Sequence, residues 1–348
     1  MKNNILLKLS FVYIIICFLF ALFSYFFIPD KTTHANSMNL RVQSKKPGFK
    51  VKIIKVPLKD YEMSFFDFFK GSEKTYSEYP ISDLNIKGNK LNLKLFSNDN
   101  ESVEKLIDLD VFESSDLNYI VENYVVERTY LFGTDIYGRD LFSRVLLGTR
   151  VSLSIGLMAV LISTILGVFF GVIGGYFGGY LDKLVVWIIN VFWSIPSLLL
   201  VIAISISLGK GFWQVYIAIG CSIWVEVARI VRGKIITEKA KDYIISTKVL
   251  GLSDVRIITN HILPNIAGPI MIIAATNFAS SILLESGLSF LGIGTQPPTP
   301  SWGYMIKENY QYILLGNAYL ALIPGVFLML LVTSFMYISN HFSEKIKI

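Results

Sequence analysis

The sequence predicts an all-α polytopic membrane protein with six transmembrane helices and an α+β extracytoplasmic insert between the first two. Only 17% of the 348 residues are charged, whereas about a quarter are charged in soluble domains. The mean hydropathy is strongly positive, at +0.54. Uncharged stretches long enough to cross a bilayer recur along the chain. These observations exclude an ordinary soluble enzyme and a disordered chain.

The first expected helix lies in residues 1–29, where an uncharged run ends at Pro29. The run is longer than the core of a usual signal peptide, and Thr33-His34-Ala35 is a poor cleavage site. We therefore expect an uncleaved N-terminal anchor, with a cleaved signal peptide as the alternative. Five further apolar runs predict the remaining spans, at residues 151–173, 184–208, 212–228, 265–284 and 316–339.

The distribution of Lys and Arg predicts the orientation in the membrane. An even number of spans places both termini on one side. If that side is the cytoplasm, the short inner segments carry twelve Lys and Arg and the short outer segments carry five, as the positive-inside rule requires. We therefore expect both termini to be cytoplasmic. The net charge of +6 then marks the inner face of a membrane protein and not a nucleic-acid partner.

Residues 30–130 form the polar segment that would lie outside. Residues 49–56 and 90–95 alternate between polar and apolar side chains, which is typical of strands. Residues 101–126 look more helical. About a hundred residues can form a modest core, but no pattern of reactive side chains indicates a chemistry. We expect a structural or docking domain.

The loop at residues 229–264, between the fourth and fifth spans, has a regular pattern. Thr237 can cap a helix, and Gly251 can take the left-handed conformation that ends one. Ser253 can cap a second helix, which Pro264 would stop just before the fifth span. A pair of short helices joined at both ends to membrane helices suits a lever for a soluble partner. The alternative is an amphipathic loop lying on the lipid headgroups.

The same loop carries a family resemblance. The segments DYIISTKVLG at 242–251 and HILPN at 261–265 resemble the coupling-loop signature of ABC importer permeases of the dipeptide/oligopeptide/nickel transport family. Further motifs of that family follow in the right order over residues 131–340. They are GTDIYGRD at 133–140, GGYFGGYLD at 174–182, Ile195-Pro196, ESGLSFLG at 285–292 and QPPTPSWG at 296–303.

The resemblance implies an ABC importer permease-like core at residues 131–348, located in the bacterial inner membrane. It implies a second homologous permease subunit, two ATPase subunits that carry ATP-Mg, and an extracytoplasmic solute-binding protein. Small peptides are the first solutes implied, and nickel chelates the second. No phosphate-binding loop occurs in the sequence, so we expect this chain to bind no nucleotide itself. The alternatives are an ion-coupled secondary transporter and a membrane-anchored sensor.

The resemblance also assigns candidate coupling residues. The family often has Glu-Ala-Ala where this chain has Ile245-Ser246-Thr247, so the acidic contact to an ATPase is missing here. The glycine of the turn is retained. The candidate ATPase-coupling residues are Ile245, Ser246, Thr247, Leu250, Gly251, Ser253, Asp254, His261 and Pro264.

Small residues and prolines mark the predicted spans. Gly167, Gly171 and Gly175 recur every four residues, which predicts a face that a neighbouring helix can approach closely. Pro196 and the pair Pro324-Gly325 are expected to kink their helices. Such kinks are candidates for gating, although they also occur in bundles with no moving part.

The candidate outer-face residues are Asp135, Arg139, Asp140 and Glu285. Residues 139–150 are expected to form a short amphipathic helix on the outer surface, and Trp302 to lie at the headgroup level. Glu226 and Glu285 are expected near span ends, where water can reach them. No pair of Cys or His residues has the spacing of metal ligands, so no metal site is expected.

Overall fold

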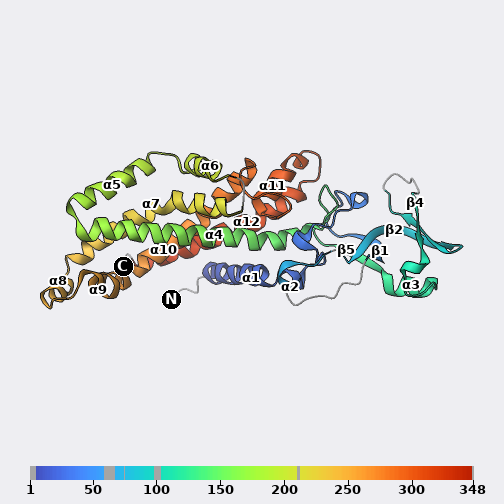
Figure 1. Ribbon diagram of the computed structural model, residues 1–348, viewed down its shortest axis with the longest axis horizontal. Coiled ribbons are helices and arrows are strands. Elements are labelled where there is room, and N and C mark those ends of the chain that lie inside the picture. The colour runs from blue at the N-terminus through green and yellow to red at the C-terminus, as the bar shows by residue number, and fades with distance from the viewer. Residues whose placement is uncertain (1–4, 59–66, 74, 98–102, 210–211, 347–348) are drawn as a thin grey trace. The chain divides into compact units, whose positions relative to one another are not determined.

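The computed structural model describes residues 5–58, 67–73, 75–97, 103–209 and 212–346, and these are mostly helical with one sheet (Figure 1). The chain forms two compact units. We call residues 1–18, 151–296 and 326–348 the helical unit, and residues 19–150 and 297–325 the sheet unit. The division falls within three long helices, α1 (Ile5–Phe27), α4 (Leu141–Val172) and α12 (Tyr319–Ile346).

The other helices that lie wholly in the helical unit follow the predicted spans and loop. They are α5 (Gly179–Trp193), α6 (Ser197–Leu208), α7 (Phe212–Lys239), α8 (Asp242–Val249), α9 (Asp254–Ile257) and α10 (Leu263–Phe290), with π-helical turns at Ile173–Phe177 and Ile258–Ile262. Five helical segments of the described chain are long and apolar enough to cross a membrane, or six if α5 and α6 together form one span. The predicted helical membrane fold is therefore confirmed.

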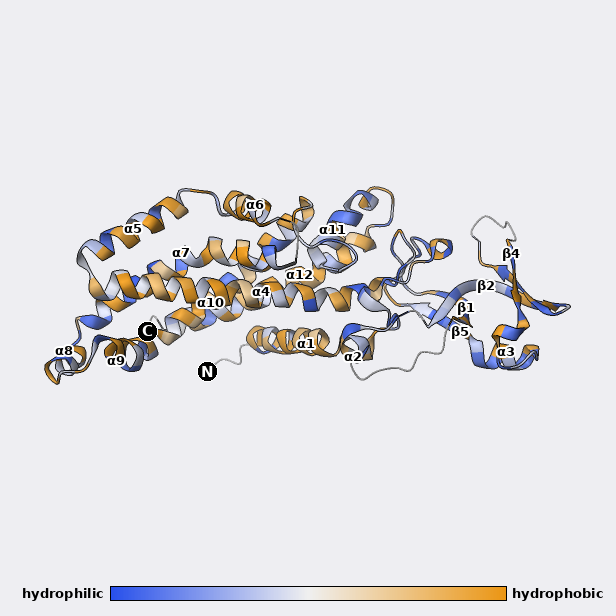
Figure 2. Cartoon of the chain, in the orientation of Figure 1, coloured by the Kyte–Doolittle hydropathy of each residue, from blue (hydrophilic) through white to orange (hydrophobic). Residues whose placement is uncertain are grey.

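The exteriors of the long helices are apolar. On α4, Leu157, Leu161, Ile165 and Phe169 repeat every four residues, and each is between 47% and 61% exposed. Figure 2 shows hydrophobic colouring along most of α1 and α4. In water such a stripe would be unfavourable, whereas hydrocarbon tails solvate it well. The exposed stripe agrees with a bilayer as the solvent of this unit.

The predicted glycine face packs α4 against α7. A Cβ atom added to Gly171 would lie 2.7 Å from Cβ of Val231, and one added to Gly175 would lie 2.8 Å from the carbonyl oxygen of Arg232. Gly167 meets Val227 in the same way. The two helices can approach this closely because these positions carry no side chain. The predicted packing role is confirmed.

The sheet unit is built on five antiparallel strands in the order β4-β3-β2-β1-β5. Ile54, Leu91 and Leu93 on the strands and Ile120 on α3 are buried in one apolar cluster. The strands are β1 (Phe49–Pro57), β2 (Tyr76–Lys87), β3 (Lys90–Leu95), β4 (Glu104–Asp108) and β5 (Val125–Tyr130), and the helices are α2 (Asp67–Lys70), α3 (Leu117–Tyr124) and α11 (Trp302–Asn309).

Two predictions for this unit have different outcomes. The strands expected at residues 49–56 and 90–95 are confirmed as β1 and β3. Residues 101–102 lie outside the described residues, and over 103–126 the helical prediction is wrong for most of the length, because α3 is the one α-helix in this described stretch. Residues 104–108 form the edge strand β4, which pairs with β3. Polar and apolar residues do not alternate along this strand, so the sequence pattern does not reveal it.

The short outer helix expected at residues 139–150 is also wrong. α4 begins at Leu141 and continues without a break through Arg150 to Val172. Its start is capped by the carboxylate of Asp140, which accepts a hydrogen bond of 3.1 Å from the backbone N–H of Ser143. The guanidinium of Arg150 donates to the carbonyl of Ala21 at 2.7 Å. Arg150 can therefore lie inside a long helix, because its guanidinium has a hydrogen-bond acceptor there.

Candidate functional site

The α8–α9 loop, residues 240–262 between α7 and α10, is the first candidate site. α7 extends to Lys239, so Thr237 does not cap a helix and that prediction is wrong. Its hydroxyl instead donates to the carbonyl of Gly233 at 3.1 Å, within α7. α8 begins at Asp242, after an extended Lys241.

Gly251 ends α8 as the sequence predicted. Its φ is +79°, in the region that favours glycine. The N–H of Gly251 donates to the carbonyl of Lys248 at 3.0 Å, and the N–H of Leu252 donates to that of Thr247 at 3.2 Å. These two bonds form a Schellman motif. Among the described residues, none beyond the adjoining ones has an atom within 4 Å of a Cβ placed on Gly251, so within this part of the chain the backbone conformation restricts the position.

The second half of the loop is continuous with α10. Ser253 precedes α9, but its side chain makes no capping hydrogen bond. Pro264 does not stop a helix, because α9, the π-helical turn and α10 form one helical segment from Asp254 to Phe290. The wider π turn ends just before Pro264 and accommodates a residue without an N–H. The loop is thus joined rigidly to α10.

The inner side of the loop is packed. Ile244 of α8 and Ile257 of α9 are buried in a cluster with Val231 and Ile235 of α7 and Ile266 of α10. The outer side is exposed, and large apolar side chains lie there among polar and charged ones such as Lys248 and Arg256. Its most exposed large side chains are Ile245 (51%), Val249 (82%), Leu250 (77%) and Val255 (70%). Among the other coupling candidates, Ser246, Gly251, Ser253, Asp254 and Pro264 are exposed, and Thr247 and His261 are half-buried.

Polar contacts that the sequence analysis did not identify hold the loop and the helices beside it. The guanidinium of Arg232 on α7 forms two hydrogen bonds, of 2.5 and 2.7 Å, to the carboxylate of Asp182 on α5, and these join α5 to α7. The hydroxyl of Tyr176 donates to Asp254 at 2.5 Å. Asn265 donates to the hydroxyl of Tyr243 at 2.7 Å. The partners lie far apart in the sequence, so no local pattern could have revealed them.

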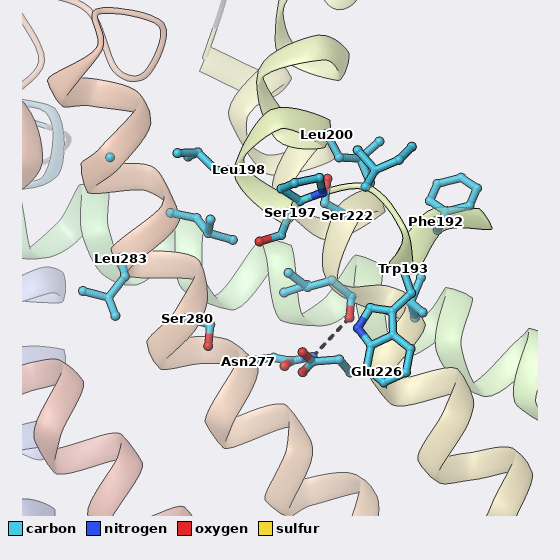
Figure 3. Close-up of a pocket in the computed structure, with 16 residues that line it drawn as sticks. Phe192, Trp193, Ser197, Leu198, Leu200, Ser222, Glu226, Asn277, Ser280 and Leu283 are labelled. Carbon is cyan, nitrogen blue, oxygen red and sulfur yellow. Dashed lines mark hydrogen bonds between the residues drawn. The ribbon is translucent and has the colours of Figure 1, made fainter. Parts of the chain in front are cut away.

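A cavity in the helical unit is the second candidate site. α5 and α6 meet at an angle of 91° across residues 194–196, so the third predicted span is broken at Pro196. The cavity beside this break has a volume of about 620 Å³. Its walls come from α5, α6, α7 and α10, and Figure 3 shows Trp193, Glu226, Asn277 and Ser280 among its lining residues.

Glu226 faces this cavity. It lies near the middle of α7, which continues thirteen residues beyond it to Lys239, so Glu226 is not at a helix end. The side chain is exposed to the cavity. Asn277 on α10 also lines the cavity and donates to the carbonyl of Ile223 at 3.4 Å.

Glu285 does not contact water, contrary to expectation. It is 0% exposed on α10. Its carboxylate accepts hydrogen bonds from the hydroxyls of Ser289, at 2.7 Å, and Thr295, at 3.2 Å. These hydroxyl donors stabilise Oε1 of the carboxylate inside the protein. Pro324 and Gly325 lie inside α12, and the kink expected there stays a prediction.

The remaining outer-face candidates are buried in the sheet unit. Asp135 accepts a hydrogen bond of 2.5 Å from Nε of Arg139, whose guanidinium also lies 3.0 Å from the carboxylate of Glu308. Asp135 is 1% exposed and Arg139 2%. Trp302 is fully buried and donates to the carbonyl of Val145 at 2.9 Å, so the predicted headgroup position is wrong.

The long apolar helices and the loop of two short helices joined to α7 and α10 define a polytopic helical membrane protein. The chain belongs to the family described as "Binding-protein-dependent transport system inner membrane component", whose sequence pattern matches residues 167–348, just over half of the chain. The resemblance found in the sequence is therefore confirmed.

Two curated relatives and one solved structure illustrate the similarity. The dipeptide transport system permease protein DppC of Bacillus subtilis is 36% identical over 199 residues, which cover 57% of this chain and 62% of DppC. The oligopeptide transport system permease protein OppC of Salmonella typhimurium is 40% identical over 196 residues, which cover 56% of this chain and 65% of OppC. The chain therefore matches less than two thirds of each relative's length. A structure of the MetNI methionine ABC transporter has 18% identity, a TM-score of 0.48, and coverage of 58% of this chain and 95% of that chain.

Proposed function

We propose that this chain is the permease subunit of an ATP-driven ABC importer that moves small peptides across the bacterial inner membrane by alternating access. One observation carries the proposal. The α8–α9 loop presents exposed apolar side chains on its outer side, while its inner side is packed against α7 and α10. An exposed apolar patch on a rigid element is suited to a protein partner, and its movement would be passed directly to two membrane helices.

The proposed assembly contains a second homologous permease, two ATPase subunits and an extracytoplasmic solute-binding protein. ATP-Mg binds to the ATPase subunits in this proposal, and the chain described here holds no nucleotide. The names of the dipeptide and oligopeptide permeases among its relatives support peptides as the solutes. The bend at Pro196 and the Pro324-Gly325 pair are the proposed gating positions.

Gly251→Val tests the coupling. Valine in the left-handed conformation of this turn costs about 1–3 kcal/mol, because φ is +79° and the side chain would make no compensating contact. We expect the ATPase recovered with the purified chain, and ATP-driven peptide uptake into vesicles, to fall about tenfold. Membrane insertion should be unchanged, since the site lies outside the long helices.

Gly251→Asn is the matched control, because asparagine tolerates the left-handed conformation better than other residues with a side chain. Asparagine should retain most of the docking and uptake. Full ATPase recovery and full uptake with the valine variant would contradict the proposal that the α8–α9 loop couples the ATPase to the membrane helices. ATP-independent uptake that collapses with the proton gradient would instead support an ion-coupled transporter.

The proposed orientation places residues 30–130 outside the cytoplasm and both termini inside. In a chain whose two cysteines, Cys17 and Cys221, are replaced by alanine, the exposed Ser115 becomes the labelling site as Ser115→Cys. We expect an impermeant thiol reagent to label it in intact spheroplasts. Thr259→Cys, on the exposed side of the α8–α9 loop, should be labelled only after the membrane is opened. The reverse pattern would overturn the orientation.

A further inference from the structure

The cavity beside the α5–α6 break has the properties of a solute-binding site. Its volume of about 620 Å³ lies in the range of ligand pockets, roughly 300–1,000 Å³. The backbone at residues 194–196 leaves the helical path between two apolar segments. Irregular backbone within a membrane is tolerated where it lines a cavity or is covered by protein. The non-helical backbone at residues 194–196 is thus compatible with a membrane segment, because it lines the cavity.

The cavity wall carries a single charged residue, Glu226. It lies near the middle of α7, within a segment apolar enough to span the membrane. An ionised carboxylate in such a segment is costly in free energy, and a residue of this kind is therefore a candidate for function. The described part of the chain provides no ion pair to it within 4.0 Å. Arg229, three residues further along α7, stacks on Trp193 at 3.2 Å from the ring centroid.

The helix ends in the wall add no net charge, because α5 ends at Trp193 and α6 begins at Ser197, and the partial charges of these two ends are opposite in sign. Asn277, Ser280 and Ser222 add neutral polar groups from α10 and α7. Such groups can form hydrogen bonds with peptide amides without adding charge.

We propose that Glu226 binds the free ammonium group of the solute as it passes through this cavity. This inference rests on the proposed import of peptides and narrows the solute to molecules with a protonated amino group. Anionic solutes, including carboxylate-rich nickel chelates, would be repelled by the same carboxylate. The neutral polar groups and the apolar side chains of the wall would contact the remainder of the peptide.

The test uses the complete transporter in vesicles with its solute-binding protein. Initial uptake of an unblocked tripeptide is measured for the wild type, Glu226→Gln and Glu226→Asp. Glutamine keeps the size of the side chain and removes its charge. Because a hydrogen bond to a charged group contributes more than a neutral one, we expect Glu226→Gln to lower uptake at subsaturating peptide by about tenfold. Glu226→Asp should recover most of this loss, and assembly measured by gel filtration should be equal for all three.

The outcomes separate the two proposals. Equal uptake by the wild type and Glu226→Gln would overturn the ammonium site and leave peptide import intact. Equal losses in Glu226→Gln and Glu226→Asp would also overturn it, because the shape of the side chain and not its charge would then matter. No ATP-driven uptake by the wild type, with an intact complex and a loaded binding protein, would instead refute peptide import itself.

Discussion

Asp135→Ala is expected to destabilise the sheet unit by about 3–5 kcal/mol, the usual cost of removing one partner from a buried ion pair. The Asp135 carboxylate is held 2.5 Å from Nε of Arg139 and 3.8 Å from Nε of Arg144. Both arginines are at most 2% exposed. Without Asp135, two buried cations would face each other, and Glu308 would be the one carboxylate within 4.0 Å of either guanidinium among the described residues.

Arg144 makes the expected loss larger. Its two terminal nitrogens have no hydrogen-bond partner among the described residues, so its balance depends on neighbouring charge. The measurement is thermal unfolding of the purified chain in detergent. Asp83→Ala is the control, because Asp83 pairs with Lys94 at 3.5 Å on an exposed strand surface, where a pair contributes about 0–1 kcal/mol. Similar unfolding temperatures for both variants would show that the buried cluster does not stabilise the fold.

This cluster shows where sequence reasoning fails. Asp135, Arg139 and Asp140 occur in a charged and glycine-containing segment, which is typical of an exposed loop. They are buried because α11 returns to the same place from more than 160 residues away, bringing Glu308 to Arg139. The position of Glu285 differs from expectation for a similar reason, since Ser289 and Thr295 donate to one oxygen of its carboxylate inside the bundle. Partners of this kind cannot be inferred from local spacing.

Features encoded by short-range physics were predictable. The apolar runs gave the long helices, and Gly251 gave the turn of the α8–α9 loop, because both depend on a few consecutive residues. Helix ends were less predictable, since Arg150 and Thr237 lie inside helices and their side chains find acceptors there. Strand β2 was missed because it contains Pro80 and several charged residues. Its pairing with β1 and β3 defines it.

The cavity was predictable only in part. Pro196 marked the interruption of the third span, but a proline alone predicts a kink and not a 91° break. From the sequence, Glu226 is expected near a span end, and its place on the cavity wall depends on how α5, α6, α7 and α10 pack. Polar residues of the wall such as Asn277 and Ser280 carry no local pattern, so the site is defined by tertiary contacts.

Gly171→Ala is expected to destabilise the helical unit, although alanine is normally better in a helix than glycine by about 1 kcal/mol. The added methyl group would lie 2.7 Å from Cβ of Val231 and 2.9 Å from the carbonyl oxygen of Ala228. α4 and α7 would have to separate, and overpacking of this kind costs about 1–3 kcal/mol. We expect a lower unfolding temperature and a smaller yield of folded protein in detergent.

Gly233→Ala provides the matched control, since no atom lies within 4 Å of a Cβ at that position of α7. The same substitution at Gly233 should leave the unfolding temperature unchanged or slightly raised. The changes in unfolding temperature caused by the two variants should therefore differ in direction. Val231→Ala combined with Gly171→Ala should restore only a small part of the loss, because alanine removes the Cγ1 contact but keeps the Cβ atom that lies 2.7 Å away and leaves the contact with the carbonyl of Ala228. Equal stability of Gly171→Ala and Gly233→Ala would mean that α4 and α7 do not pack through their backbones.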